Sequence, residues 1–221
     1  MAFNHSYQTA KPVISTVETN KVLKNTYFLL AMTLAFSALT AGISMTMDLP
    51  RFTGIICSLI GLGMLFVIQK KANSASAIGL VFVFTGIMGF GLGPLLSHYA
   101  AMPNGGMLIM QALGSTALIF FGLSAYALTT KKDFSFMGGF LMVGLIVVII
   151  SSLVNLFIGS SVMFMAINAA VVLIMSGLIL FDTSRIINGG ETNYVLATVS
   201  LYLNIYNLFT SLLALLGSSD D

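Results

Sequence analysis

Charged residues are the scarcest class in this sequence. Of its 221 residues, nine are Lys or Arg and seven are Asp or Glu, so that 7% of the chain is charged, whereas about 25% is usual for a soluble domain. Cysteine occurs once and histidine twice. These scarcities exclude a disulfide scaffold, an intrinsically disordered chain and a nucleic-acid-binding protein, because each of these needs cysteines, charge or a basic patch.

Apolar residues make up 57% of the chain, and its mean hydropathy is +1.01. One water-soluble core of this size cannot hide so much apolar surface, so the expected solvent is a lipid bilayer. The strands of a membrane β-barrel alternate in polarity over about 10 residues, and stretches such as residues 144–150 do not alternate. The predicted fold class is therefore an all-α integral membrane protein.

Runs without any charged residue set the expected number of membrane-spanning helices. Since a helix needs about 20 residues to cross the hydrocarbon layer, the three shorter runs fit one crossing each and the two longest fit two, which gives seven. The charge-free runs are residues 25–47, 52–69, 72–130, 134–181 and 192–219.

Turn residues place the breaks within the two longest runs. The first break is expected at residues 97–106, which contain a Pro-Asn-Gly-Gly cluster, and the second near Gly159-Ser160-Ser161. The resulting helices are residues 25–47, 52–69, 77–97, 107–129, 137–158, 162–182 and 193–216. They form a predicted transmembrane domain at residues 25–217, preceded by a disordered polar tail at 1–24 and followed by a short tail at 218–221.

Basic residues gather on one side of this topology. If the N-terminal tail shares a side with every second loop, that side carries eight of the nine basic residues, and Arg51 is alone on the other. Lys and Arg are in excess on the cytoplasmic side of most membrane proteins, so the N-terminus is predicted in the cytoplasm and the C-terminus outside. The eight residues are Lys11, Lys21, Lys24, Lys70, Lys71, Lys131, Lys132 and Arg185.

Catalytic groups do not come together in this topology. The Asp-Thr-Ser sequence at residues 182–184 is similar to the motif of aspartic proteases, but that chemistry needs two carboxylates about 3 Å apart, and no second acidic residue lies within a predicted span. Ser124 has no base, because His98 is expected at the opposite end of the bundle. The histidines, the cysteine and the carboxylates are scattered along the chain, and none of them occurs at the spacing that metal ligands show. We expect neither an enzyme nor a bound cofactor.

Small residues at four-residue spacing predict close helix packing. Gly89 and Gly93 form a G-x-x-x-G pair, and Ala31 with Ala35 has the same spacing. Such pairs let two helix backbones approach closely, either within one bundle or across a dimer interface. In a chain with 21 glycines, packing within the bundle is the favoured interpretation.

Polar residues concentrate between the sixth predicted helix and the seventh. If the sixth helix continues past its predicted end, Asp182 and Arg185 are one turn apart and can form an ion pair. The seventh helix carries a polar stripe, and a helix of this kind should face the bundle centre rather than lipid. The stripe contains Ser200, Asn204 and Asn207, with Tyr202 and Tyr206 on a neighbouring stripe.

Two interpretations of these residues stay open from their positions. In the structural one, Asp182 and Arg185 cap the cytoplasmic end of the sixth helix, and the asparagines hold helices together. In the functional one, the residues form a polar centre that senses protons or passes a cation.

At these positions the sequence resembles the signature of the Bax inhibitor-1 family of seven-helix membrane proteins. The resemblance rests on Phe-Asp-Thr at residues 181–183 and on Ser-Leu-Tyr-Leu-Asn-Ile-Tyr-Asn-Leu-Phe at residues 200–209. Similarity to a bacterial inner-membrane branch of that family lies in residues 24–30, 93–94, 129–133 and 189–194, the last of which begins with Gly189, Gly190 and Glu191. Together these motifs extend over residues 21–217.

The resemblance implies six helices around a central seventh. It also implies that, in members with calcium-leak activity, two aspartates on the sixth and seventh helices form a proton-sensitive latch. Asp182 matches the first aspartate, but Asn204 stands at the second position. An amide has no acidic proton to share, so this departure disfavours a pH-gated leak.

For the bacterial branch, the resemblance implies a modulator of FtsH, the ATP-dependent protease of the inner membrane. The chain would then be a slowly degraded substrate that competes with others, with residues 1–24 as the handle for the protease and the tight bundle as the part that resists. The implied partners are FtsH, its membrane regulators and the lipid bilayer. The alternative is a pH-sensitive calcium leak channel, with calcium or protons as its ligands.

Overall fold

The computed structural model describes residues 16–218, and within this range all regular structure is helical. Seven helices are each long and apolar enough to cross a bilayer, which agrees with the predicted all-α membrane fold. A short 3₁₀ turn, η1, precedes the fifth of them. The elements are α1 (Thr16–Met45), α2 (Thr53–Lys71), α3 (Ala77–Ala100), α4 (Gly105–Thr130), η1 (Ser135–Met137), α5 (Gly138–Ile158), α6 (Ser161–Ile187) and α7 (Tyr194–Ser218).

Both breaks predicted within the long apolar runs are confirmed. Helix α3 ends at Ala100 and α4 begins at Gly105, while α5 ends at Ile158 and α6 begins at Ser161. The second break depends on Gly159, whose φ of 68° is costly for residues other than glycine. The hydroxyl of Ser160 then accepts a hydrogen bond from the backbone N–H of Met163 at 3.3 Å, and so caps the start of α6.

Helix α1 begins earlier than its charge-free run. Its first residue is Thr16 rather than residue 25, so residues 16–24 of the predicted disordered tail are helical. The prediction failed here because charge marks where a chain leaves the hydrocarbon layer, whereas a helix continues into water with residues such as Glu18, Lys21 and Lys24. The other part of the predicted tail, residues 1–15, lies outside the described residues.

Helix α6 ends later than predicted, at Ile187 rather than residue 182. Asp182, Thr183 and Ser184 are buried, so the first charge after the apolar run does not mark the end of the helix. The helix ends instead where Gly189 adopts a φ of 73°, a conformation that favours glycine.

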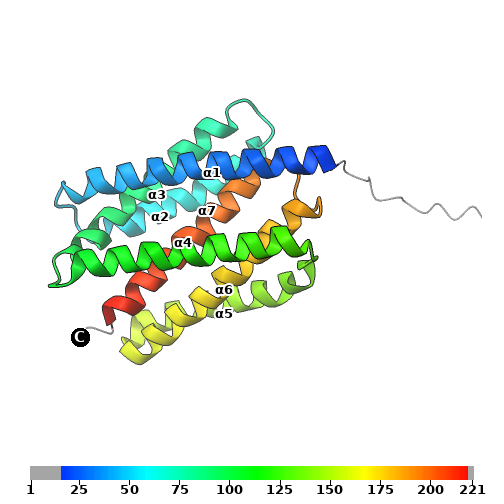
Figure 1. Ribbon diagram of the computed structural model, residues 1–221. Helices are drawn as coiled ribbons and strands as arrows, with labels where there is room; N and C mark the ends of the chain where they lie inside the picture. The colour runs from blue at the N-terminus through cyan, green and yellow to red at the C-terminus, as the bar shows by residue number, and fades with distance from the viewer. Residues whose placement is uncertain (1–15, 219–221) are drawn as a thin grey trace, which may run out of the picture.

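Helix α7 runs through the middle of the bundle (Figure 1) and packs against α1, α3, α4 and α6. Helix α2 packs mainly on α3, and α5 mainly on α6, so four helices rather than six make the main contacts with α7. Consecutive helices run in opposite directions (Figure 1). The start of α1 therefore lies at the same end as the α2–α3, α4–α5 and α6–α7 loops.

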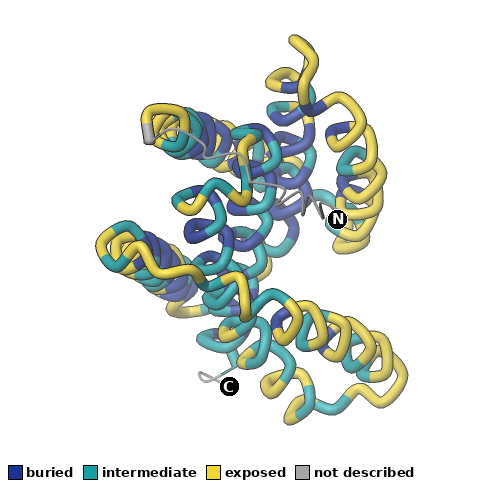
Figure 2. The backbone as a smooth tube through the Cα atoms, turned by 90° about the vertical axis from the view of Figure 1, so that its right-hand side faces the viewer, coloured by how far each residue is buried: buried dark blue, intermediate teal, exposed yellow. Residues whose placement is uncertain are grey.

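Burial follows this arrangement (Figure 2), with buried residues towards the centre and exposed ones on the outer helices. Helices α3 and α7 have the largest buried share, whereas α5 has only Leu141 and Val148 buried. Large apolar side chains cover the outside, and the side chain of Phe157 in α5 is 92% exposed. An apolar exterior of this extent is suited to lipid rather than to water.

Glycines of α3 lie directly against α1. A Cβ atom built on Gly89 would overlap the carbonyl oxygen of Ser37, and one built on Gly93 would overlap Ser44. The interpretation of the G-x-x-x-G pair as packing within the bundle is thus confirmed.

Candidate functional site

The polar stripe of α7 faces the end of α6, where Asp182 is 8% exposed. Its Oδ2 accepts a hydrogen bond from the hydroxyl of Ser200 at 2.5 Å and another from Nδ2 of Asn204 at 2.8 Å. The two donors are four residues apart, and so lie on one face of α7. We call these three residues the polar clamp, because they join α6 to α7.

The chemistry of the polar clamp is that of one acceptor with two donors. A hydrogen bond contributes about 0.5–1.5 kcal/mol between neutral groups and about 1.5–3 kcal/mol to a charged one, so the two bonds together are a substantial link between the two helices. The amide of Asn204 donates to the carboxylate of Asp182 but has no acidic proton to exchange with it. The arrangement therefore holds the helices in register without forming a coupled pair of acids.

Arg185 does not use the ion pair that its spacing from Asp182 allows. Its guanidinium lies 3.7 Å from the carboxylate of Glu191, donates to the carbonyl oxygen of Gly190 at 3.2 Å and lies over the ring of Phe181, 5.6 Å from its centroid. The carboxylate of Asp182 is directed towards α7 instead. The partners of Arg185, Glu191 and Gly190, come from the loop after α6.

The glycine-rich loop closes around the end of α6. The backbone N–H of Gly190 donates to the carbonyl oxygen of Arg185 at 2.7 Å, and Gly189 provides the left-handed conformation that this turn requires. Glu191 accepts a hydrogen bond from the backbone N–H of Asn193 at 2.9 Å. The motif at residues 189–191 is thus a turn that returns the chain into α7.

Tyr202 makes contacts that the sequence did not indicate. Its side chain is 1% exposed, and its hydroxyl lies 2.7 Å from the hydroxyl of Ser37 in α1 and 3.3 Å from the carbonyl oxygen of Thr85 in α3. Because a carbonyl can only accept, Tyr202 donates to Thr85 and accepts from Ser37. A serine within an apolar run, as at position 37, is the one signal that could have suggested this link.

Tyr206 and Asn207 do not join the polar clamp. Asn207 donates to the carbonyl oxygen of Leu203 in its own helix at 2.9 Å. Tyr206 lines a cavity of about 300 Å³ between α1, α3, α4 and α7, together with Ser37 and Tyr202. Asp182 is not among the residues that line this cavity, so the predicted polar centre is divided into a clamp and a separate cavity.

Two further polar contacts, both missed from the sequence, connect the loops at the lysine-rich end. Asn193 caps α7 by accepting the backbone N–H of Val195 at 2.9 Å, and it donates to Asn73 in the α2–α3 loop at 2.7 Å. Ser184 donates to the carbonyl oxygen of Lys132 at 3.0 Å and accepts from the backbone N–H of Phe134 at 2.9 Å. An Asn directly before an apolar helix is a cap signal that could have identified the first contact.

The described residues offer no group of three or more His, Cys, Asp or Glu side chains that could hold a metal ion. The geometry of residues 16–218 thus provides a clamp, a cavity and a set of links between helices.

Replacing Tyr202 by phenylalanine is expected to destabilise the bundle by about 1–3 kcal/mol, because the hydroxyl of Ser37 then stays buried without its partner. Thermal unfolding of the purified protein in detergent measures the loss. Tyr126→Phe is the control, since Tyr126 is 47% exposed on α4 and its change should stay within about 0.5 kcal/mol. Equal unfolding temperatures for the two variants would show that the Tyr202 hydroxyl does not link the helices.

Residues 19–221 match the family model described as "Inhibitor of apoptosis-promoting Bax1". The chain is 52% identical over 204 residues to "Modulator of FtsH protease YccA" of Escherichia coli strain K12, and the aligned part covers 92% of each chain.

Two other relatives are similar over the same extent. An "Uncharacterized membrane protein" of Vibrio cholerae is 57% identical over 203 residues, which cover 91% of both chains. The "Inner membrane protein YccA" of Escherichia coli O6:H1 is 52% identical over 92% of both chains. These relatives are named as membrane proteins or as a modulator, and none of the three is named as an enzyme.

Proposed function

The chain belongs to the Bax inhibitor-1 family, and we propose that it acts in the bacterial inner membrane as a modulator of the membrane protease FtsH. The observation that carries this proposal is the 52% identity, over 92% of both chains, to a protein named a modulator of that protease. The seven helices long enough to cross a bilayer support a multi-pass location. We infer that FtsH, with its membrane regulators, is the partner.

We propose that the end of the bundle with most basic residues faces the cytoplasm. Lys70 and Lys71 lie in the last turn of α2, Lys131 and Lys132 follow α4, and Arg185 lies in the last turn of α6. These positions share one end of the bundle with the start of α1 (Figure 1). The positive-inside tendency supports placing this end in the cytoplasm and the C-terminus outside.

The proposed mechanism is that of a slowly degraded, competing substrate. A processive protease that takes hold of a cytoplasmic terminus must then open the helix bundle behind it, and the opening free energy limits the rate. The polar clamp, the Tyr202 contacts and the α1–α3 glycine contacts all oppose that opening. The protease would stay occupied for as long as the bundle resists.

Deleting residues 2–15 tests the proposed handle without touching helix α1, which begins at Thr16. We expect the chain to persist several-fold longer in cells that contain active protease, because the segment that the protease is proposed to grip is then missing. Pulse-chase labelling measures its lifetime. A tail of the same length with these residues in scrambled order is the control, and it should restore degradation.

In cells with catalytically inactive protease, the full-length and shortened chains should have equal lifetimes. If the deletion leaves turnover unchanged in cells with active protease, the N-terminal segment is not the handle. Co-purification from detergent-solubilised membranes then distinguishes a handle elsewhere in the chain from the absence of any complex.

A pH-sensitive calcium leak is not part of this proposal. The latch that the resemblance implies for leak-active members needs two carboxylates, whereas Asn204 faces Asp182 here. Oδ2 of Asp182 accepts hydrogen bonds from both Ser200 and Asn204, and Asp182 is not among the residues that line the cavity of about 300 Å³ beside Tyr202.

A further inference from the structure

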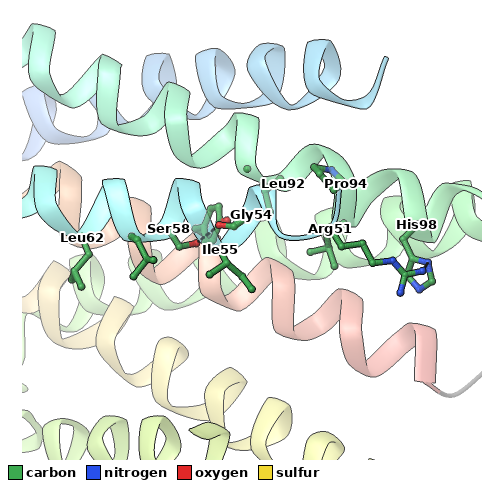
Figure 3. A pocket seen from close by; sticks show the side chains of 12 residues that line it. Arg51, Gly54, Ile55, Ser58, Leu62, Leu92, Pro94 and His98 are labelled. Carbon is green, nitrogen blue, oxygen red and sulfur yellow. Dashed lines mark hydrogen bonds between the residues drawn. The ribbon is translucent and has the colours of Figure 1, made fainter. Parts of the chain in front are cut away.

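A second and larger cavity opens between α2 and α3, and Tyr206 of α7 also lines it. Its volume is about 680 Å³, within the range of about 300–1,000 Å³ typical of small-molecule sites. The rim towards lipid consists of Ile55, Leu59 and Leu62 of α2, each more than half exposed. Figure 3 shows Leu62 at one end of this groove and Arg51 with His98 at the other.

The polar end of the groove contains hydrogen-bond donors that can bind an anion. The guanidinium of Arg51 lies 3.4 Å from Nδ1 of His98, and both side chains belong to the groove lining. Because a guanidinium can only donate, this contact makes Nδ1 the acceptor and places the ring proton on Nε2. Nε2–H and the other guanidinium N–H groups are left as donors.

The N-terminus of α2 lies at the same end of the groove and also favours an anion. The helix begins at Thr53, two residues after Arg51, and its N-cap residue, Phe52, makes no side-chain capping bond. The backbone N–H of Thr53 already donates to the carbonyl oxygen of Pro50 at 3.0 Å. The N–H groups of Gly54 and Ile55, with the helix dipole, are therefore what favours a negative charge here. The helix terminus, the guanidinium and the imidazole therefore favour the same kind of ligand.

The two ends of the groove lie at different depths in the membrane. Arg51 directly precedes the charge-free run of residues 52–69, so it lies at headgroup level. From Ile55 to Leu62 the helix rises by about 10 Å, into the hydrocarbon layer. A ligand that matches the groove has an anionic group at the interface and an apolar chain that descends along α2.

We propose that the groove between α2 and α3 binds one anionic phospholipid, with its phosphate on Arg51 and His98 and one acyl chain along the rim to Leu62. The lipid comes from the leaflet at the end of the bundle opposite the lysines. The lining also contains Gly54 and Gly91, and small residues of this kind often admit a second membrane helix. These two glycines already lie against each other between α2 and α3, so the exposed rim of Ile55, Leu59 and Leu62 fits an acyl chain better than a helix of another protein.

The sequence contains no tryptophan, so Leu62→Trp places the single tryptophan of the variant in the groove, where it can be excited separately from the tyrosines. The variant is reconstituted into vesicles of phosphatidylcholine that contain a small fraction of either phosphatidylglycerol or phosphatidylcholine brominated in mid-chain. Bromine quenches tryptophan on contact. We expect the brominated phosphatidylglycerol to associate about fivefold more strongly than the brominated phosphatidylcholine, the factor expected for one basic residue at an anionic headgroup.

Two controls separate the groove from the general lipid surface. Leu118→Trp reports on α4, where Leu118 is 77% exposed and lines no part of the groove, and it should be quenched equally by both lipids. Adding Arg51→Gln to Leu62→Trp should remove the preference, whereas adding Lys71→Gln, at the other end of α2, should preserve it.

Equal quenching of the Leu62→Trp variant by the two lipids would overturn the proposal. A preference that survives Arg51→Gln, or one that appears equally at Leu118→Trp, would also overturn it, because the selectivity would then not belong to this groove. Failure of the FtsH proposal would leave these results unaffected, since the lipid measurement uses the purified chain without the protease.

Discussion

Replacing Gly93 by alanine is expected to lower the unfolding temperature of the purified protein by about 2–12 °C, since overpacking of this kind costs about 1–3 kcal/mol and each kcal/mol corresponds to about 2–4 °C at this chain length. The added methyl group would overlap the side chain and the carbonyl carbon of Ser44 in α1. A side chain can turn away, but backbone cannot, so α1 and α3 must separate along their contact. Thermal unfolding in detergent measures the loss.

The same helix offers a matched control. Gly79 has no neighbouring atom within 4 Å of an added Cβ, so Gly79→Ala should stabilise α3 by about 0.5–1 kcal/mol through the higher helix propensity of alanine. Ser44→Gly in the Gly93→Ala background should recover part of the loss, because it removes the overlapping side-chain atoms. Equal effects of alanine at positions 79 and 93 would contradict the close contact of α1 and α3.

This pair of variants also tests the proposed function. If resistance of the bundle limits the rate of degradation, Gly93→Ala should shorten the lifetime of the chain in cells with active protease, and Gly79→Ala should not. The order of lifetimes is then expected to follow the order of unfolding temperatures. Equal lifetimes despite different stability would show that opening of the bundle does not limit turnover.

The number of helices could be predicted from the sequence because membranes impose a simple rule. Each crossing needs about 20 residues without charge, and the turn residues near Pro103 and Gly159 divided the two double-length runs correctly. The ends of α1 and α6 could not be predicted in the same way. A charged residue inside a helix shows where the helix meets water only if that residue is exposed, and Asp182 is buried.

The candidate site could be predicted only in part, for a related reason. The spacing of Ser200 and Asn204 shows that they share a face of α7, but spacing within one helix does not say which helix lies opposite. The partners of Tyr202 in α1 and α3 depend on the packing of three helices, which periodicity does not encode. Similarly, Arg185 pairs with Glu191 because the loop after α6 folds back over it.

The second large effect is expected at Asn204, where an aspartate would place two carboxylates against each other. Nδ2 of Asn204 lies 2.8 Å from the carboxylate of Asp182, and two carboxyl groups at such a distance cannot both ionise without strong repulsion. They must share a proton in the folded bundle, whereas both lose their protons in the unfolded chain. The folded state of the Asn204→Asp variant then binds more protons, so its stability should fall as the pH rises.

Unfolding temperatures at pH 5 and pH 8 measure this effect. The wild type has a single carboxyl at this site, that of Asp182, so its stability should depend less on pH, whereas Asn204→Asp should lose about 3–5 kcal/mol at pH 8 as an uncompensated buried charge develops. Asn204→Leu, which removes a donor without adding an acid, should destabilise by about 1.5–3 kcal/mol at both pH values.

Asn207→Asp is the matched control, since Asn207 bonds only within its own helix and its variant should show the weaker pH dependence. If the Asn204 and Asn207 aspartate variants respond alike to pH, the polar clamp does not hold α6 and α7 together, because only position 204 places the second carboxylate against Asp182.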